Sequence, residues 1–324
     1  NMRTALMCSK FSTSSERKAT ARSALRHAAR TDVSGGADSG RGRLMIIAGG
    51  GKLPLYVAEA ARAAGEDPSI VCLFGESDLD WAGFEHAEIS IGDVAKLASI
   101  KRAKNLTRVV LSGSVRKRPE LQQLRLTFSS LLKLPAIIRR LIAGGDDTVL
   151  RMAIGLLESE GLRVVGAHEI VPDLLATVGP LAAGSPSGDD LRDVKAGVEA
   201  AEALGRLDIG QGAVAVGGRV VALEGAEGTD RMLERVAELR REGRISARRR
   251  GVLVKLCKPQ QDMRADLPTI GLSTIENARK AGLAGIAVEA GRALVLERDA
   301  VIRAADAAGL FVVGVDRALP GGLG

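Results

Sequence analysis

The chain has 324 residues, a formal net charge of +7, and 46% hydrophobic but only 2% aromatic residues. This length suits two domains, each large enough to bury its own core. Residues 1–43 hold nine basic and three acidic side chains, so the remainder of the chain carries a net charge of only +1. Bulk charge therefore gives no reason to expect a nucleic-acid partner.

The three cysteines are Cys8, Cys72 and Cys257, and they lie far apart without a metal-binding spacing. They indicate neither a disulfide framework nor a zinc site, as is typical of a reducing compartment. No apolar run approaches the roughly 18 to 20 residues of a membrane span. Residues 1–43 lack the apolar core of a secretory signal, and we expect a disordered or non-native extension there, with an organelle transit peptide as the alternative.

Residues 44–178 alternate short apolar runs with helical segments, which predicts an α/β domain with a Rossmann-like open parallel sheet. The first run, 44–48, leads into a glycine loop, and Pro54 then opens a helix that ends near Ala64. Further strands are expected at 69–74, 84–91, 108–112 and 162–167. Helices are expected at 93–104 and, with an interruption near Gly144 and Gly145, over 119–160.

Residues 179–188 collect glycine, proline and serine, and they are predicted to be the linker to a separate C-terminal α/β domain, 189–318. A hairpin is expected at 212–216 and 219–223, because Gly217-Gly218 suits its two-residue turn. Helices are predicted at 189–204, 229–241, 273–281 and 298–308. Strands are predicted at 251–256, 285–288, 293–296 and 310–315.

The glycine loop is the first candidate site, and it consists of Gly49, Gly50, Gly51 and Lys52. Glycines let backbone N–H groups approach a phosphate at a helix start. Pro54 breaks the dinucleotide fingerprint and Leu53 breaks the Walker loop, so neither NAD nor a P-loop is indicated. A plain tight turn and a nucleotide or sugar contact both stay open.

Ser112, Gly113 and Ser114 follow a strand of the same predicted sheet. Ligands of open sheets bind at the carboxyl ends of strands, so this segment is a candidate ligand contact. A surface loop is the alternative.

A second candidate site combines Glu224, Glu227 and Asp230 after a predicted strand and at a helix start. Carboxylates this close together repel one another unless a cation compensates, and Mg²⁺ takes such oxygen ligands. Ordinary helix capping, with Thr229 as the cap, is the alternative.

A third candidate site is the segment 255–271, in which cations, an amide and carboxylates alternate after a strand. Phosphoryl transfer requires positive groups for the phosphate oxygens and a carboxylate that holds a metal or orients water. A solvated charged loop would also explain the pattern. Its polar members are Lys255, Lys258, Gln261, Asp262, Arg264, Asp266 and Thr269.

These segments resemble one family. GAEGTD at 225–230, VLVK at 252–255, KPQQDMRADLPTIG at 258–271 and GLAGIAVEAG at 282–291 look like the C-terminal catalytic domain of the LpxI family of UDP-2,3-diacylglucosamine pyrophosphatases. IIAGGGKLP at 46–54 is similar to the N-terminal domain of that family. The resemblance runs from residue 44 to 317.

The resemblance implies an enzyme of lipid A synthesis that uses Mg²⁺ or another divalent cation to split UDP-2,3-diacylglucosamine into UMP and 2,3-diacylglucosamine 1-phosphate, lipid X. Asp266 is then the leading catalytic carboxylate, as metal ligand or water orienter. Lys255 and Lys258 would neutralise the diphosphate. Asp230, Glu224 and Glu227 are further metal candidates, and Gln261, Thr229 and Thr269 are further substrate contacts. Ser112, Gly113 and Ser114 would touch diphosphate or uridine.

The same resemblance implies a UDP-linked acylated glucosamine lipid as partner, a transient membrane contact and a location at the cytoplasmic face of the inner membrane. A homodimer is left open. The basic run at 240–250 would meet anionic lipid headgroups, or it is a solvated helix end. The apolar stretch 121–134 would line an acyl groove, or it is core.

Two other functions stay open. One is a non-catalytic nucleotide- or lipid-binding protein, and the other is a nucleotide-dependent oxidoreductase that uses the glycine loop.

Overall fold

The computed structural model describes residues 42–115 and 146–317. From residue 42 onward the chain groups into one compact unit. The expected N-terminal extension, except its last two residues, and the apolar stretch 121–134 lie outside the described residues. None of the helices in the described ranges has the length and apolar character required to span a bilayer.

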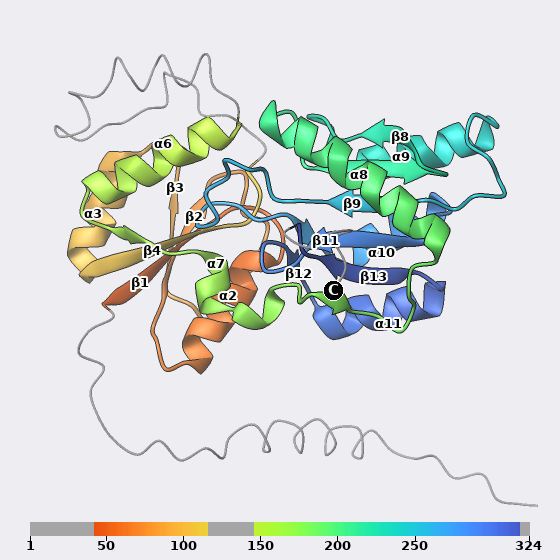
Figure 1. Ribbon diagram of the computed structural model, residues 1–324. Helices are drawn as coiled ribbons and strands as arrows, with labels where there is room; N and C mark the ends of the chain where they lie inside the picture. Colours follow the sequence, from red (N-terminus) through yellow and green to blue (C-terminus); the bar gives the residue numbers. More distant parts are fainter. Residues whose placement is uncertain (1–41, 116–145, 318–324) are drawn as a thin grey trace, which may run out of the picture. The chain divides into compact units, whose positions relative to one another are not determined.

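The first sheet is five-stranded and parallel, in the order β3-β2-β1-β4-β5 (Figure 1). This confirms the predicted α/β class and its open parallel sheet. Its strands are β1 (Arg43–Ala48), β2 (Ser69–Leu73), β3 (His86–Ile89), β4 (Leu106–Ser112) and β5 (Arg163–Val164). Its helices are α2 (Leu53–Ala63), α3 (Val94–Lys104), α6 (Asp146–Ser159) and α7 (Ala167–Ile170).

Strand β1 is apolar and buried from Leu44 to Ala48, because both faces of the sheet are covered. Leu44 and Ile46 point into a core formed with α2 and α7, whereas Met45 and Ile47 point into a core formed with α3 and α6. The alternation of side chains along a strand thus divides one short run between two hydrophobic layers.

The second sheet is six-stranded and mixed, in the order β6-β13-β11-β9-β7-β8. Strands β9, β11 and β13 are parallel, whereas β6, β7 and β8 each run antiparallel to the neighbour with which they pair. These strands are β6 (Gly179–Pro180), β7 (Gly212–Val216), β8 (Arg219–Leu223), β9 (Val252–Lys255), β11 (Gly285–Glu289) and β13 (Phe311–Val315).

Helices cover both faces of the second sheet. Helix α8 (Gly188–Arg206) packs on one face, through a core that includes Val194 and Ala201. Helices α9 (Gly228–Arg241), α10 (Leu272–Lys280) and α11 (Arg298–Ala308) supply the core of the other face (Figure 1). Helix α8 begins at a capping box, because Ser187 and Asp190 hydrogen bond each other's backbone N–H.

The predicted hairpin is confirmed. Gly217 and Gly218 join β7 to β8 with φ angles of 64° and 77°. Two successive residues in this region form the turn that matches the twist of a hairpin, and only glycine enters it without strain.

Several expected boundaries differ from the structure. Gly179 and Pro180, which we expected in the linker, form β6 and pair with β13. The expected strand 162–167 is reduced to β5, because the chain turns into α7 at Ala167. The expected strand 293–296 becomes β12 (Leu294–Val295), which pairs with the unpredicted β10 (Thr269–Ile270) and not with the main sheet. A 3₁₀ helix, Pro172–Leu174, precedes β6.

The carboxyl ends of β1 and β4 continue into loops whose backbones touch. Gly50 and Ser114 exchange two backbone hydrogen bonds of 2.8 and 2.9 Å. A Cβ on Gly113 would lie 2.7 Å from the Gly50 carbonyl oxygen, and one on Gly49 would lie 2.4 Å from the Ser114 carbonyl oxygen. These glycines therefore allow two backbones to pack directly on each other.

Gly113→Ala tests this contact against Gly83→Ala, since both glycines have a positive φ, 88° and 93°, but only Gly113 has a close neighbour. Both variants should lose about 1–2 kcal/mol of unfolding free energy from the left-handed backbone. Gly113→Ala should lose about 1–3 kcal/mol more because the neighbouring loop must move. Urea unfolding measures both, and equal losses would contradict the packing account.

Candidate functional site

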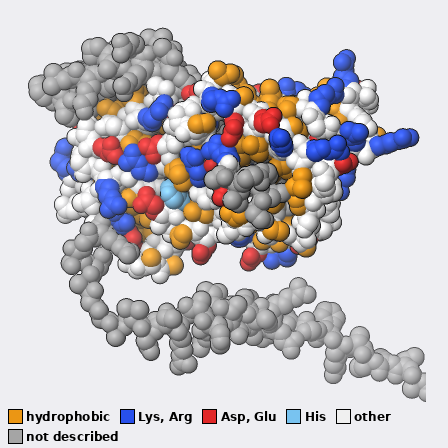
Figure 2. Space-filling view, viewed as in Figure 1, with side chains coloured by type: hydrophobic (Ala, Val, Ile, Leu, Met, Phe, Trp, Pro, Cys, Tyr) orange, Lys and Arg blue, Asp and Glu red, His pale blue; other side chains and the backbone are white. Residues whose placement is uncertain are grey.

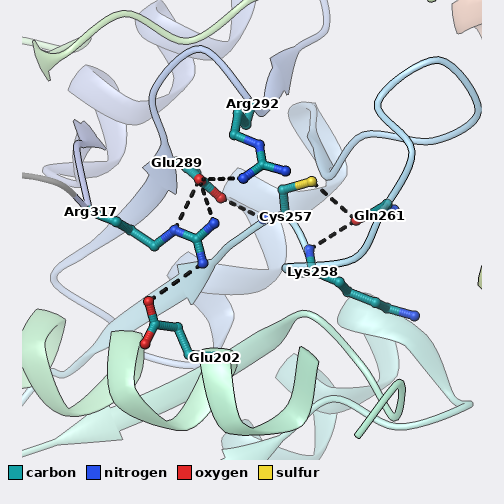
Figure 3. A network of polar contacts seen from close by, with 7 residues as sticks. All are labelled: Glu202, Cys257, Lys258, Gln261, Glu289, Arg292 and Arg317. Atoms are coloured by element: carbon teal, nitrogen blue, oxygen red, sulfur yellow. Dashed lines mark hydrogen bonds and ion pairs between the residues drawn. The ribbon is translucent and has the colours of Figure 1, made fainter. Parts of the chain in front are cut away.

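Asp266 is held by the loop that leaves β9. The Gln261 side chain is buried, and its Nε2 donates a 2.8 Å hydrogen bond to Asp266 Oδ2. Its Oε1 accepts from the Lys258 N–H at 3.0 Å and from the Cys257 thiol at 3.3 Å (Figure 3). Gln261 therefore connects the carboxylate to the backbone at the end of β9, and it orients the carboxylate.

A buried ion cluster fixes the same strand end. Glu289, the last residue of β11, accepts the Cys257 N–H at 2.9 Å. Its other oxygen lies 2.8 Å from Arg317 Nη2 and 3.5 Å from Arg292 Nη1 (Figure 3). The arginines compensate the buried charge of Glu289, which then holds the start of the loop in place.

Four charged side chains influence Asp266. Its side chain reaches solvent, yet protein surrounds it densely enough that desolvation raises its pKa, while Lys255 and Lys258 oppose the rise. Asp147 and Glu224 raise the pKa further. The structure thus brings Asp266, Lys255, Lys258 and Glu224, all chosen from the sequence, into one electrostatic environment.

Both lysines already have oxygen partners. Lys255 is buried and donates to the Thr269 carbonyl oxygen at 3.0 Å. Lys258 forms a 2.6 Å ion pair with Asp208 Oδ1. Asp208 lies in the left-handed region, with φ of 55°, in the turn between α8 and β7. Sequence reasoning missed Asp208, because no motif marks that turn and only the fold brings it to Lys258.

Asp147 of α6 is the second missed residue, and it comes from the other domain. It is buried, its Oδ2 lies 2.8 Å from Arg151 Nη2, and the Asp262 backbone donates a hydrogen bond to its carboxylate. Desolvation raises its pKa, against the opposing charge of Arg151. The sequence did offer one indication of this residue: Asp146 and Asp147 come directly after Gly144-Gly145, where the predicted helix is interrupted.

The second candidate site is divided among different partners. Glu224 is buried and accepts from Thr229 Oγ1 at 2.6 Å and from the Gln211 N–H at 3.3 Å. Glu227 pairs with Arg235 at 2.9 Å, and Asp230 accepts from Asn277 Nδ2 at 3.1 Å. Thr229 does not cap α9, because Glu227 occupies the N-cap position and no side chain caps there. The prediction of a Thr229 cap was therefore wrong.

The metal candidates are not gathered into one set. Among the described residues, no group of three or more His, Cys, Asp or Glu side chains is arranged to hold a metal ion. Mg²⁺ needs less than this, since it is commonly held by one or two carboxylates together with substrate phosphates and water. Asp266 is accessible to solvent and the charge of Glu224 acts on it, which fits that way of binding Mg²⁺. Asp230 and Glu227 instead interact with Asn277 and Arg235.

The N–H groups of the glycine loop are already used. Gly49 donates to Ser112 O at 2.8 Å, Gly50 to Ser114 O at 2.8 Å, and Gly51 to Asp78 Oδ1 at 3.0 Å. Lys52 Nζ pairs with Glu297 of the second domain at 3.1 Å. This geometry favours the tight turn over a ready-made phosphate cradle, and a substrate contact of Ser112, Gly113 or Ser114 stays a prediction.

The fold and the site define a two-domain α/β enzyme that assembles carboxylates and lysines at strand ends, as enzymes of phosphate chemistry do. Residues 43–174 match the LpxI N-terminal domain, and residues 177–313 match the LpxI C-terminal domain. The chain belongs to the LpxI family, and it is accordingly a hydrolase of the pyrophosphatase type.

Two known proteins illustrate the comparison. The chain is 43% identical, over 85% of its length and 98% of the relative's, to UDP-2,3-diacylglucosamine pyrophosphatase LpxI of Caulobacter vibrioides. A crystal structure of Thermus thermophilus UDP-glucose 4-epimerase with NAD is 12% identical, covering 82% of this chain and 83% of that one. Its TM-score of 0.26 is too low to indicate a shared fold.

Cys257 should react slowly with alkylating reagents. Burial raises the pKa of this thiol to about 11. At pH 8 about a thousandth of it is then ionised, against roughly a quarter of an ordinary thiol, so alkylation should be more than about a hundredfold slower. Because the folded-state pKa is raised, the free energy of unfolding should also fall as pH rises from about 9 to 11.

Iodoacetamide labelling at pH 8, mapped by mass spectrometry, measures the rate at Cys257 in folded and urea-unfolded protein. Equal rates in the two states would contradict the buried thiol.

Proposed function

We propose that this chain hydrolyses the pyrophosphate bond of UDP-2,3-diacylglucosamine, a step of lipid A synthesis, and releases UMP and 2,3-diacylglucosamine 1-phosphate, lipid X. The observation that carries the proposal is the 43% identity to the Caulobacter pyrophosphatase over 98% of that protein. The joint placement of Asp266, Lys255 and Lys258 supports the same reaction type.

In the proposed reaction, the lysines and Asp266 have different roles. Lys258 and Lys255 stabilise the negative charge of the diphosphate oxygens, and Gln261 keeps Asp266 turned toward them. Asp266 orients the attacking water or holds the metal. Water adds to the phosphorus on the glucosamine side, the bond from that phosphorus to the bridging oxygen breaks, and UMP leaves with the bridging oxygen.

Mg²⁺, or another divalent cation, is the proposed cofactor. Asp266 would hold it, and Glu224 would be the second candidate carboxylate, since its charge already acts on Asp266. When bound, it would withdraw charge from the phosphate oxygens and so make the phosphorus more susceptible to water.

We propose that the reaction takes place at the cytoplasmic face of the inner membrane, with transient contact, because the proposed substrate is a lipid. Only some side chains of the basic run at 240–250 are available for the proposed membrane contact. Arg240 donates to the carbonyl oxygens of Ser246, Arg249 and Ala281, and Arg250 donates to that of Leu283, so both fasten the turn after α9. Arg241, Arg244 and Arg248 are exposed and suited to anionic headgroups. Figure 2 shows Lys and Arg side chains projecting from the end of the molecule that carries the turn after α9. A homodimer stays a prediction.

Asp266→Ala should abolish turnover of UDP-2,3-diacylglucosamine by about a thousandfold or more while substrate still binds, because the lysines that face the diphosphate remain. Turnover is followed by release of UMP, and binding by calorimetry. Glu199→Ala, which removes an exposed carboxylate of α8, is the matched control and should keep full activity. A wild-type protein that binds without hydrolysis would favour the non-catalytic alternative.

Hydrolysis in ¹⁸O-labelled water tests the attacked phosphorus and the metal together. The label should appear in lipid X and not in UMP, and a chelator should stop the reaction until Mg²⁺ is restored. Label in UMP would reverse the assignment of the attacked phosphorus. Undiminished hydrolysis with chelator would remove the metal from the mechanism.

A further inference from the structure

Helix α6 of the first domain contacts the loop of the second domain that carries Asp266. Arg264 Nη1 lies 2.8 Å from Glu158 Oε1, across 106 residues of sequence. Ala265, the next residue, packs against the apolar cluster that includes Ile154 and Leu157 of α6. Figure 1 shows the loop that leaves β9 reaching toward this helix. The loop therefore depends on both domains for its position.

One stripe of α6 makes these contacts. Residues 147, 151, 154 and 158 are spaced by four, three and four positions, which places them on a single helix face. The Asp262 backbone donates to Asp147. The pKa of Asp262 is lowered by its hydrogen bond to Arg264 and also by the charge of Arg151. Asp147 and Glu158 thus contact the loop, and Ile154 belongs to the cluster on which Ala265 packs. Arg151 acts on the loop through its charge.

Hydrogen bonds to Asp262 orient the Arg264 guanidinium before it contacts Glu158. Its Nε and Nη2 bind both oxygens of Asp262, at 3.0 and 2.7 Å, and its backbone N–H donates to Asp262 Oδ1 at 3.0 Å. This fork fixes the guanidinium plane and directs Nη1 toward Glu158, so little side-chain freedom is lost when the ion pair forms.

The ion pair is too exposed to matter much for stability. The side chains of Arg264 and Glu158 keep 38% and 46% of their surface, and such pairs contribute about 0–1 kcal/mol. Its position matters more, because Ala265 N–H and Asp266 N–H both donate to the Asp262 carbonyl oxygen, at 3.0 and 3.4 Å. Moving Arg264 therefore moves the turn that bears Asp266.

We propose that Glu158 is a positioning residue, which acts through Arg264 to set the place of Asp266 relative to the first domain. The activity measurement that tests this role rests on the proposed function, hydrolysis of UDP-2,3-diacylglucosamine. Through this contact, helix α6 of the first domain fixes the loop of the second domain that carries Asp266. Residues held by a helix are positioned more precisely than residues on a free loop.

Glu158→Arg tests the proposal, because it sets two like charges against each other. The expected result is a fall in kcat of about tenfold with KM and the unfolding midpoint nearly unchanged. In the Arg264→Gln background, Glu158→Arg should lower kcat by less than about twofold, because the arginine that residue 158 would repel is absent. Glu234→Arg, which breaks the exposed Arg231–Glu234 pair of α9, is the matched control and should leave kcat unchanged.

Amide hydrogen exchange of residues 258–267, measured without substrate, gives a second readout that does not depend on the reaction. Exchange should rise in Glu158→Arg and not in Glu234→Arg. If the wild-type protein fails to hydrolyse the lipid, the proposed function falls while exchange still tests the positioning role. Unchanged exchange, or an equal fall of kcat in both backgrounds, would overturn the proposal.

Discussion

The hydrogen bond from the Gln261 amide to Asp266 joins the candidate carboxylate to a buried network of hydrogen bonds and ion pairs in the second domain. Gln261 is buried, and its carbonyl oxygen is occupied by the Lys258 N–H and the Cys257 thiol. Glu289 in turn holds the Cys257 N–H, with two arginines balancing its charge. Because the Lys258 N–H and the Cys257 thiol both need an acceptor, the side-chain amide has one orientation available, and it presents its N–H group to Asp266.

The cations of the site are held by oxygens before any substrate arrives. Lys258 is paired with Asp208, and Lys255 with the Thr269 carbonyl. Outside this site, Lys52 of the glycine loop is also paired, with Glu297, the residue before α11. Fixed positive groups stabilise developing charge more effectively than mobile ones, because little reorganisation is needed during the reaction. The carboxylate partners also keep the ligand-free site from accumulating a large net charge.

Much of the fold follows from local patterns, whereas the site depends on tertiary contacts. An apolar run such as β1 is buried on both faces, and Gly217-Gly218 determines its own turn, so both were predicted. Asp266, Lys255 and Lys258 lie in one marked segment, so the sequence could select them as candidates together. Asp208 and Asp147 reach the site only because separate loops and helices meet there, whereas Glu227 and Asp230, close together in sequence, have separate partners.

The central claim is that the diphosphate lies between the lysines of the second domain and Asp266. A crystal structure of Asp266→Asn with intact UDP-2,3-diacylglucosamine and Mg²⁺ tests it most directly. The account predicts phosphate oxygens on Lys258 and Lys255, with the glucosamine-side phosphorus facing residue 266. A diphosphate bound instead at the glycine loop of the first domain, away from residue 266, would contradict it.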